Sequence, residues 1–352
     1  MHSNEDERIC RPNRDSGTAV CPLDDRMDSP LALATSQASP SASFIAEFTL
    51  ILRNFLVRMN YHAPDTQVND KLRSEVAAQI LSWNHVLGPA FVQDTIDTSC
   101  TMAESAYAHT SYDHQFLIAT YTTFLAYIED LGEHNVEALG KVVRWCVTRE
   151  DLQDPILEGM LLQFRDMYNY YPRFGAEAIN TSTLGAMLGM HIECVSKDMV
   201  IAPRATMYPG FLRLRTGAGI GFALFNFVKD WRDPADSYYL QLIPAMEQYI
   251  NAVNDILSFY KETLQGDTNT YIHFRAAAEQ NEVLAVLRDL VEETLENIRN
   301  IEALTAEDPQ LAHICRSHLM GYVEFHLRAK RYRLHELQLG SHDPDTAAHA
   351  QS

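Results

Sequence analysis

The sequence predicts an all-α fold, with roughly ten or more helices in a single domain. First, apolar residues recur at intervals of three and four over most of the chain, which is the period of an amphipathic helix. Second, alternating strand patterns and Asn-Gly hairpin turns are missing from the sequence. Third, prolines lie mainly between the periodic stretches, as in IAPRATMYPGF and WRDPADS, where they would end helices.

Four stretches predict the principal helices. Residues 43–59, 281–304 and 313–337 have the apolar spacing of amphipathic helices. Residues 114–132 are apolar on every face, so we expect a central, buried helix there.

The two ends of the chain differ from the helical part. Residues 1–42 are rich in Ser, Pro, Ala and Asp without a sustained period, which predicts a disordered leader. Residues 341–352 predict a short disordered tail, so we assign the folded domain to residues 43–340. The first residues lack the apolar segment of a secretory signal. No apolar run reaches the length of about 18 residues that spans a bilayer, so we expect a cytoplasmic protein without membrane insertion.

The charge of the chain is strongly acidic. Lys and Arg total 28 against 47 Asp and Glu, a formal net charge of −19. This balance disfavours binding to nucleic acid or to anionic membranes. Metal cations are compatible with it, if acidic side chains converge in the fold.

A row of oxygen-bearing side chains stands out in NDILSFYKE, residues 254–262. Asn254, Ser258 and Glu262 are four residues apart each time, so they would form one stripe along a helix. Amide, hydroxyl and carboxylate oxygens are ligands that Mg²⁺ accepts, and Lys261 beside them could reach a bound phosphate. The alternative is a polar stripe that faces solvent.

Acidic residues end the apolar stretch FLAYIEDLGEH. Glu129, Asp130 and Glu133 would lie at the C-terminus of that helix, where the helix dipole disfavours negative charge. A bound cation would compensate for this arrangement, and a solvated helix end is the alternative. Basic residues gather in YPGFLRLRTG, with Arg213 and Arg215, and at 330–333, where they could hold a phosphate or pair with the protein's own carboxylates.

Together these stretches resemble the class I terpene synthases, and most closely the fungal trichodiene synthases. NDILSFYKE matches the second metal motif of that family, N-D-x-x-S-x-x-K-E, without a departure. The segment with Arg213 resembles the one that holds the diphosphate-sensing arginine, and Arg331-Tyr332 resembles the C-terminal basic pair. The first metal motif departs, because the family has D-D-x-x-D where this chain has Glu129-Asp130-Leu131-Gly132-Glu133. The similarity runs more weakly from about residue 45 to about residue 338.

The resemblance implies a helical bundle around an active-site cavity and a diphosphate-releasing carbon–oxygen lyase. Farnesyl diphosphate would be ionised and cyclised to a sesquiterpene of secondary metabolism, and a homodimer is compatible with the family. Three Mg²⁺ ions are implied. Asn254, Ser258 and Glu262 would hold one of them. The metal and diphosphate ligands implied besides these are Glu129, Asp130 and Glu133 for metal, and Arg213, Lys261, Arg331 and Tyr332 for diphosphate. On closure, Asp130 would pair with Arg331.

The cyclisation would need an apolar cavity with aromatic walls, since aromatic faces stabilise passing positive charge. The three glycines of TGAGIGF, residues 216–222, predict a helix break that faces the reacting chain, with close helix packing as the alternative. The aromatic candidates, for each of which packing in the core is favoured over a place in the cavity wall, are Trp83, Tyr121, Phe124, Tyr127, Phe222 and Phe225.

Two other functions remain open from the sequence. One is an atypical prenyltransferase or a non-cyclising diphosphate lyase, although trans-prenyltransferases usually have two Asp-rich motifs. The other is a catalytically degenerate prenyl-binding protein. The terpene product and the prenyl chain length depend on cavity shape, which the sequence does not define.

Overall fold

The computed structural model describes residues 40–83, 87–150, 152, 154–233 and 236–339. The predicted tail lies wholly outside these residues, and the predicted leader does so except for residues 40–42.

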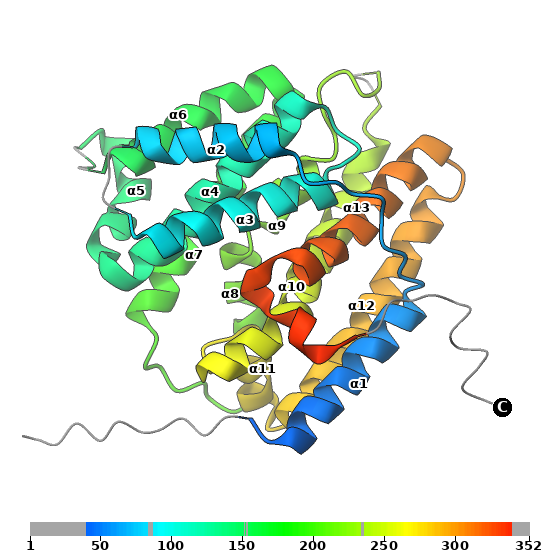
Figure 1. Cartoon of the computed structure of the whole chain (residues 1–352). Helices are drawn as coiled ribbons and strands as arrows, with labels where there is room; N and C mark the ends of the chain where they lie inside the picture. The colour runs from blue at the N-terminus through cyan, green and yellow to red at the C-terminus, as the bar shows by residue number, and fades with distance from the viewer. Residues whose placement is uncertain (1–39, 84–86, 151, 153, 234–235, 340–352) are drawn as a thin grey trace, which may run out of the picture. The chain divides into compact units, whose positions relative to one another are not determined.

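The all-α prediction is confirmed, because the described residues form thirteen α-helices and three short 3₁₀ helices without a strand (Figure 1). The α-helices are α1 (Ala42–Arg58), α2 (Asp70–Ser82), α3 (Pro89–Ala106), α4 (Tyr112–His134), α5 (Val136–Thr148), α6 (Pro155–Tyr170), α7 (Arg173–Val195), α8 (Met207–Thr216), α9 (Gly219–Leu224), α10 (Ile243–Gln265), α11 (Tyr271–Glu279), α12 (Val283–Thr305) and α13 (Pro309–Arg328). The 3₁₀ helices are η1 (Tyr238–Leu242), η2 (Lys330–Tyr332) and η3 (Leu334–Leu337).

Side chains and turns set the helix ends in the way that the local sequence predicts. Asp154 and Asp308 cap the first turns of α6 and α13, each just before a proline that has no N–H to leave unsatisfied. Helix α10 stops at Gly266, which takes a left-handed conformation with φ of 69°.

Helix α10 lies among α9, α12 and α13, and α4 packs against α3, α5, α6 and α7 (Figure 1). The prediction that residues 114–132 form a buried helix is confirmed, since Ile118, Tyr121 and Ile128 of α4 are fully buried. Helices α3 and α13 approach very closely at Gly321, where an added Cβ would lie 2.1 Å from the Ser105 carbonyl oxygen. Glycine at this position therefore permits the contact between the two helices.

The last predicted helix is shorter than its periodicity indicates. Residues 313–337 were expected to be one helix, but α13 ends at Arg328. Ala329 is extended, with ψ of 121°, and Arg333 is left-handed, with φ of 59°. These two residues turn the chain into η2 and η3, and η2 packs against α3 and α10. No helix of the described residues is long and apolar enough to cross a membrane.

Candidate active site

Two adjoining cavities lie between α4, α8, α10 and η2. The first, which we term the inner cavity, measures about 110 Å³ and has mixed walls, whose apolar residues include Met102, Leu125 and Ile250. The second, which we term the vestibule, measures about 290 Å³ and has mostly charged and polar walls. The residues that line both cavities, which we term the boundary residues, are Glu129, Met190, Arg213, Thr216, Asn254, Arg331 and Tyr332.

Asn254, Ser258 and Glu262 of α10 all line the vestibule. They therefore share one face of the helix, as their spacing predicts. Ile256 and Leu257 of the same helix are fully buried in the core. Burial raises the pKa of the Glu262 carboxyl, and nearby Lys261 opposes this rise. We call these three residues the donor stripe.

Arg213, in the last turn of α8, is tied to α10 by several contacts. Its Nε lies 2.8 Å from an oxygen of Asp255, and its Nη2 donates to Asn254 Oδ1 at 3.0 Å and to the Asn251 carbonyl at 3.1 Å. Burial disfavours the charged guanidinium, but the carboxylate of Asp255 outweighs it and the pKa of Arg213 is raised. Arg213 therefore keeps its charge beside the vestibule.

Three further predicted residues, Lys261, Arg331 and Tyr332, line the vestibule near Glu129. Arg331 Nη2 donates to Glu129 Oε2 at 3.3 Å, and the Arg331 guanidinium lies 5.8 Å from the centre of the Tyr332 ring. Lys261 Nζ lies 5.9 Å from the same ring. Burial, assisted by the positive charge of Arg331, lowers the pKa of Lys261. Three cationic side chains thus face one polar compartment.

Other predicted residues lie elsewhere. Asp130 lines neither of the two cavities and lies beside His134, with 3.6 Å between Oδ2 and Nδ1. Arg331 is paired with Glu129 in the structure, and the contact of Asp130 with Arg331 stays a prediction for the closed form. Glu133 belongs to α4, and its side chain is outside the described part of the structure. Arg215 donates to the Phe211 carbonyl and lines neither cavity.

Acidic side chains line the vestibule besides Glu129 and Glu262. They are Asp255 of the second metal motif, Asp267 just after α10, and Glu193 on α7. Burial raises the pKa of Glu193 to about 7, and the negative charge of Glu129 adds to the rise. No motif contains Glu193, so only the packing of α7 beside α8 could reveal it.

The predicted helix break is confirmed between α8 and α9. Helix α8 ends at Thr216, Ala218 takes a left-handed conformation with φ of 48°, and Thr216 and Gly217 line the inner cavity. The side chain of Asn251 lies against the break: it is 5% exposed, and neither its oxygen nor its nitrogen has a hydrogen-bond partner among the described residues. A buried amide without partners is uncommon, and this one borders the inner cavity.

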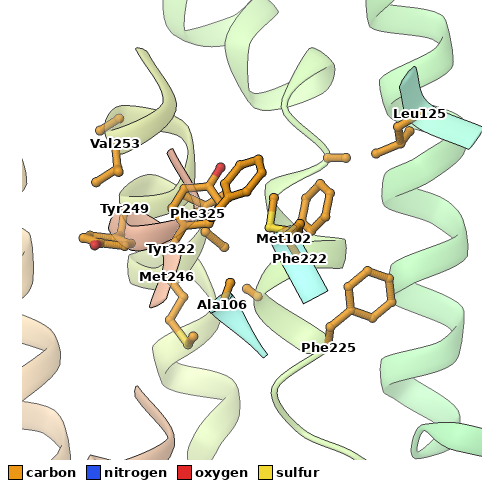
Figure 2. Close-up of a cluster of buried hydrophobic side chains, with 14 of the residues drawn as sticks. Met102, Ala106, Leu125, Phe222, Phe225, Met246, Tyr249, Val253, Tyr322 and Phe325 are labelled. Atoms are coloured by element: carbon orange, nitrogen blue, oxygen red, sulfur yellow. The ribbon is translucent and has the colours of Figure 1, made fainter. Parts of the chain in front are cut away.

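The aromatic prediction was right for one residue of six. Phe222 lines the inner cavity, and the remaining aromatic walls come from Tyr322, Phe325 and Tyr332. Figure 2 shows Phe222, Tyr322 and Phe325 in one buried cluster with Met102. The other five candidates pack in the hydrophobic core, which is the other interpretation given for them from the sequence. Their core contacts are the stacking of Trp83 on Phe124, the hydrogen bonds of Tyr121 to Thr183 and of Tyr127 to Asp154, and the packing of Phe225 on Tyr121.

The sequence of most of the chain matches a known protein family. Residues 73–351 match the family described as Trichodiene synthase (TRI5). The chain belongs to this family.

Relatives of this trichodiene synthase family member are named as terpene synthases. The chain is 32% identical over 290 residues to Terpene synthase 29 of Postia placenta, which covers 81% of this chain and 83% of that protein. It is 32% identical over 296 residues to Terpene synthase BipA of Cochliobolus sativus, covering 82% and 88%. It is 28% identical over 251 residues to Alpha-cuprenene synthase COP6 of Coprinopsis cinerea, covering 71% and 76%.

The fold of this trichodiene synthase family member is also found in more distant enzymes. Linalool/nerolidol synthase from Streptomyces clavuligerus, solved in complex with 2-fluorogeranyl diphosphate, superposes with a TM-score of 0.55. The match covers 79% of this chain and 97% of that one at 13% identity, so the likeness concerns the fold alone.

The donor stripe fits a magnesium site that is completed by substrate. No group of three or more His, Cys, Asp and Glu side chains in the described part of the chain is arranged to hold a metal ion. The donor stripe differs from such a group, because its oxygen donors are one amide, one hydroxyl and one carboxylate. Mg²⁺ keeps water and substrate phosphate oxygens among its ligands, so few protein ligands are sufficient.

Proposed function

We propose that this chain is a Mg²⁺-dependent terpene cyclase that ionises farnesyl diphosphate and converts the resulting cation to a sesquiterpene. The observation that supports it most is the arrangement of the two cavities in series. A charged vestibule with oxygen donors and three cations adjoins a smaller cavity whose walls include aromatic and aliphatic side chains. One end of the site suits a diphosphate and the other suits a hydrocarbon chain.

The chain's own residues would act mainly on the leaving group. Arg213, Lys261 and Arg331, with the Tyr332 hydroxyl, would bind the diphosphate oxygens and stabilise the negative charge that develops as the C–O bond breaks. Asn254, Ser258 and Glu262 would hold Mg²⁺, which acts as a Lewis acid on the same oxygens. No protein nucleophile is required for this ionisation.

The inner cavity would protect the carbocation that remains. Its aromatic and aliphatic side chains would limit the access of water, which would otherwise quench the cation. The faces of Phe222, Tyr322 and Phe325 would stabilise positive charge by roughly 1–2 kcal/mol each when desolvated. The cavity shape would then direct ring closure.

The test is to incubate purified protein with MgCl₂ and farnesyl diphosphate, and to measure diphosphate release and products by gas chromatography–mass spectrometry. We expect cyclic hydrocarbon, abolition by excess EDTA, and at least a ~100-fold loss of turnover in Asn254→Ala and Glu262→Ala. Gln265→Ala, at the exposed end of α10, is the matched control and should retain activity.

Each alternative gives a different result in this assay. Full turnover in EDTA would refute the metal requirement. Acyclic products alone would identify a non-cyclising lyase, and transfer of the prenyl group to an added acceptor would identify a prenyltransferase. Tight binding without diphosphate release would identify a prenyl-binding protein. Geranyl and geranylgeranyl diphosphate, run in parallel, test the chain length.

A further inference from the structure

His326 on α13 links the core of the protein to the donor stripe. The residue is fully buried, with 0% exposure. Its Nδ1 lies 2.8 Å from the Tyr322 carbonyl oxygen, and its Nε2 lies 3.2 Å from Asn254 Nδ2. It lies outside both metal motifs and is not part of the basic pair Arg331-Tyr332. Its only sequence signal is its place on the buried face of an amphipathic helix.

The partners of the ring define its tautomer. A carbonyl oxygen can only accept, so Nδ1 must bear the proton that is donated to Tyr322. The neutral ring then offers a lone pair at Nε2, which accepts a hydrogen bond from the Asn254 amide. Burial lowers the pKa of His326 to about 3, with a further contribution from the positive charges of Arg331, Lys261 and Arg213, so the ring is neutral.

Two hydrogen-bond partners therefore distinguish the oxygen of the Asn254 carboxamide from its nitrogen. Arg213 donates to Oδ1 at 3.0 Å, and His326 accepts from Nδ2 at 3.2 Å. Rotating the carboxamide by half a turn would bring donor against donor at Arg213 and acceptor against acceptor at His326. The observed orientation is the one in which all these groups are satisfied.

We propose that His326 is a positioning residue that holds the Asn254 carboxamide with its oxygen toward the vestibule, where it can bind Mg²⁺. The inference rests on the proposed function, in which Asn254 is a metal ligand. The competing explanation is that the ring only fills space among Tyr322, Phe325 and Tyr332, whose ring centres lie 4.4–4.8 Å away.

Two substitutions separate positioning from packing. His326→Gln can place an acceptor oxygen where Nε2 lies, but it loses aromatic packing. His326→Phe keeps the aromatic packing and loses the acceptor. The measurement is calorimetric titration of MgCl₂ into protein with inorganic diphosphate, together with the melting temperature of each variant.

If His326 positions Asn254, Mg²⁺ affinity should fall at least about 10-fold in His326→Phe and less in His326→Gln, as for other residues that orient metal ligands. The melting temperature should show the opposite order. If His326→Phe does not fold, His326→Asn replaces it, because its side chain can reproduce the Nδ1 donor and not the Nε2 acceptor.

The Asn254→Asp background provides a second check. Both oxygens of an aspartate are equivalent, so its orientation no longer depends on His326. His326→Phe should therefore change Mg²⁺ affinity by less than about 2-fold in that background. Equal affinities in wild type and His326→Phe, or losses that follow the melting temperature, would overturn the inference. Absence of Mg²⁺ binding in the wild-type protein would instead refute the proposed function.

Discussion

Glu129 shows how a single methylene group can matter in this site. Its carboxylate reaches Arg331 Nη2 at 3.3 Å, and the side chain is 52% exposed. Aspartate, which the trichodiene synthases have in this motif, would withdraw the oxygens by the length of a C–C bond. The resemblance implies that this carboxylate binds Mg²⁺, which requires near-ideal geometry, and a site adapted to glutamate would then not tolerate this shift.

We therefore expect Glu129→Asp to reduce turnover roughly 10- to 100-fold although it conserves charge, which is the cost of about 1 Å of misplacement. Steady-state diphosphate release measures it, and Glu129→Gln is the control of equal length without charge. A several-fold gain in turnover would show that glutamate is a handicap at this position.

Glu247 on α10 provides a prediction about pH. Burial raises the pKa of its carboxyl to about 7 from 4.5. The folded protein therefore retains a proton that the unfolded chain releases, and stability falls as pH rises from about 4.5 to about 7.

We expect Glu247→Gln to remove this fall, with a gain over wild type of about 1 kcal/mol at pH 8 after allowance for the partial exposure of the group. At pH 5 the gain should be smaller. Urea unfolding at both pH values measures the difference, and identical gains at the two pH values would show that the carboxyl is not the cause.

The break between α8 and α9 leaves no room for a side chain at its first residue. A Cβ at Gly217 would lie 2.0 Å from Asn251 Oδ1 and 2.8 Å from Arg213 Nη1, so one of these groups must move. The break thus brings together a helix end, a buried amide and a cation of the vestibule.

Gly217→Ala should lower stability by about 1–3 kcal/mol and should impair turnover by displacing Arg213. Gly210→Ala is the matched control in the same helix, because a Cβ there meets nothing within 4 Å. It should be neutral or stabilising by up to about 1 kcal/mol. Equal melting temperatures for the two variants would contradict the close contact.

The sequence predicts a helix or a site well when the residues that determine it lie within one short segment of the chain. The donor stripe could be predicted, because a spacing of four residues places side chains on one helical face whatever the helix packs against. The roles of Asn251 and His326 could not, since they depend on which helices meet. Most aromatic walls of the inner cavity could not be predicted for the same reason, because the aromatic rings of α4 pack in the core. The end of α13 has no Pro or Gly, so its turn into η2 has no local signal.

At the scale of the whole molecule, the helical domain begins with its own cap. Ser41 Oγ accepts from the Phe44 N–H at 3.2 Å, and α1 packs against α10 and α12. The composition of the leader cannot support a packed core. Deletion of residues 2–38 should therefore change the melting temperature by less than about 2 °C, whereas Ser41→Ala should lower stability by about 1 kcal/mol.

Thermal unfolding of the full chain and of both variants makes the comparison. A larger effect of the deletion than of Ser41→Ala would show that the leader contributes to the folded domain. A loss of activity at unchanged stability would show that it acts on the site instead.

In the proposed function, the boundary residues would also influence the order in which products leave the enzyme. Arg213, Arg331 and Tyr332 line both cavities, so a diphosphate bound among them would lie between the inner cavity and the vestibule. A hydrocarbon in the inner cavity would then be blocked on that side, and we expect diphosphate to be released before the terpene. Added diphosphate should consequently slow every turnover, while added terpene dissolved in the buffer should have little effect.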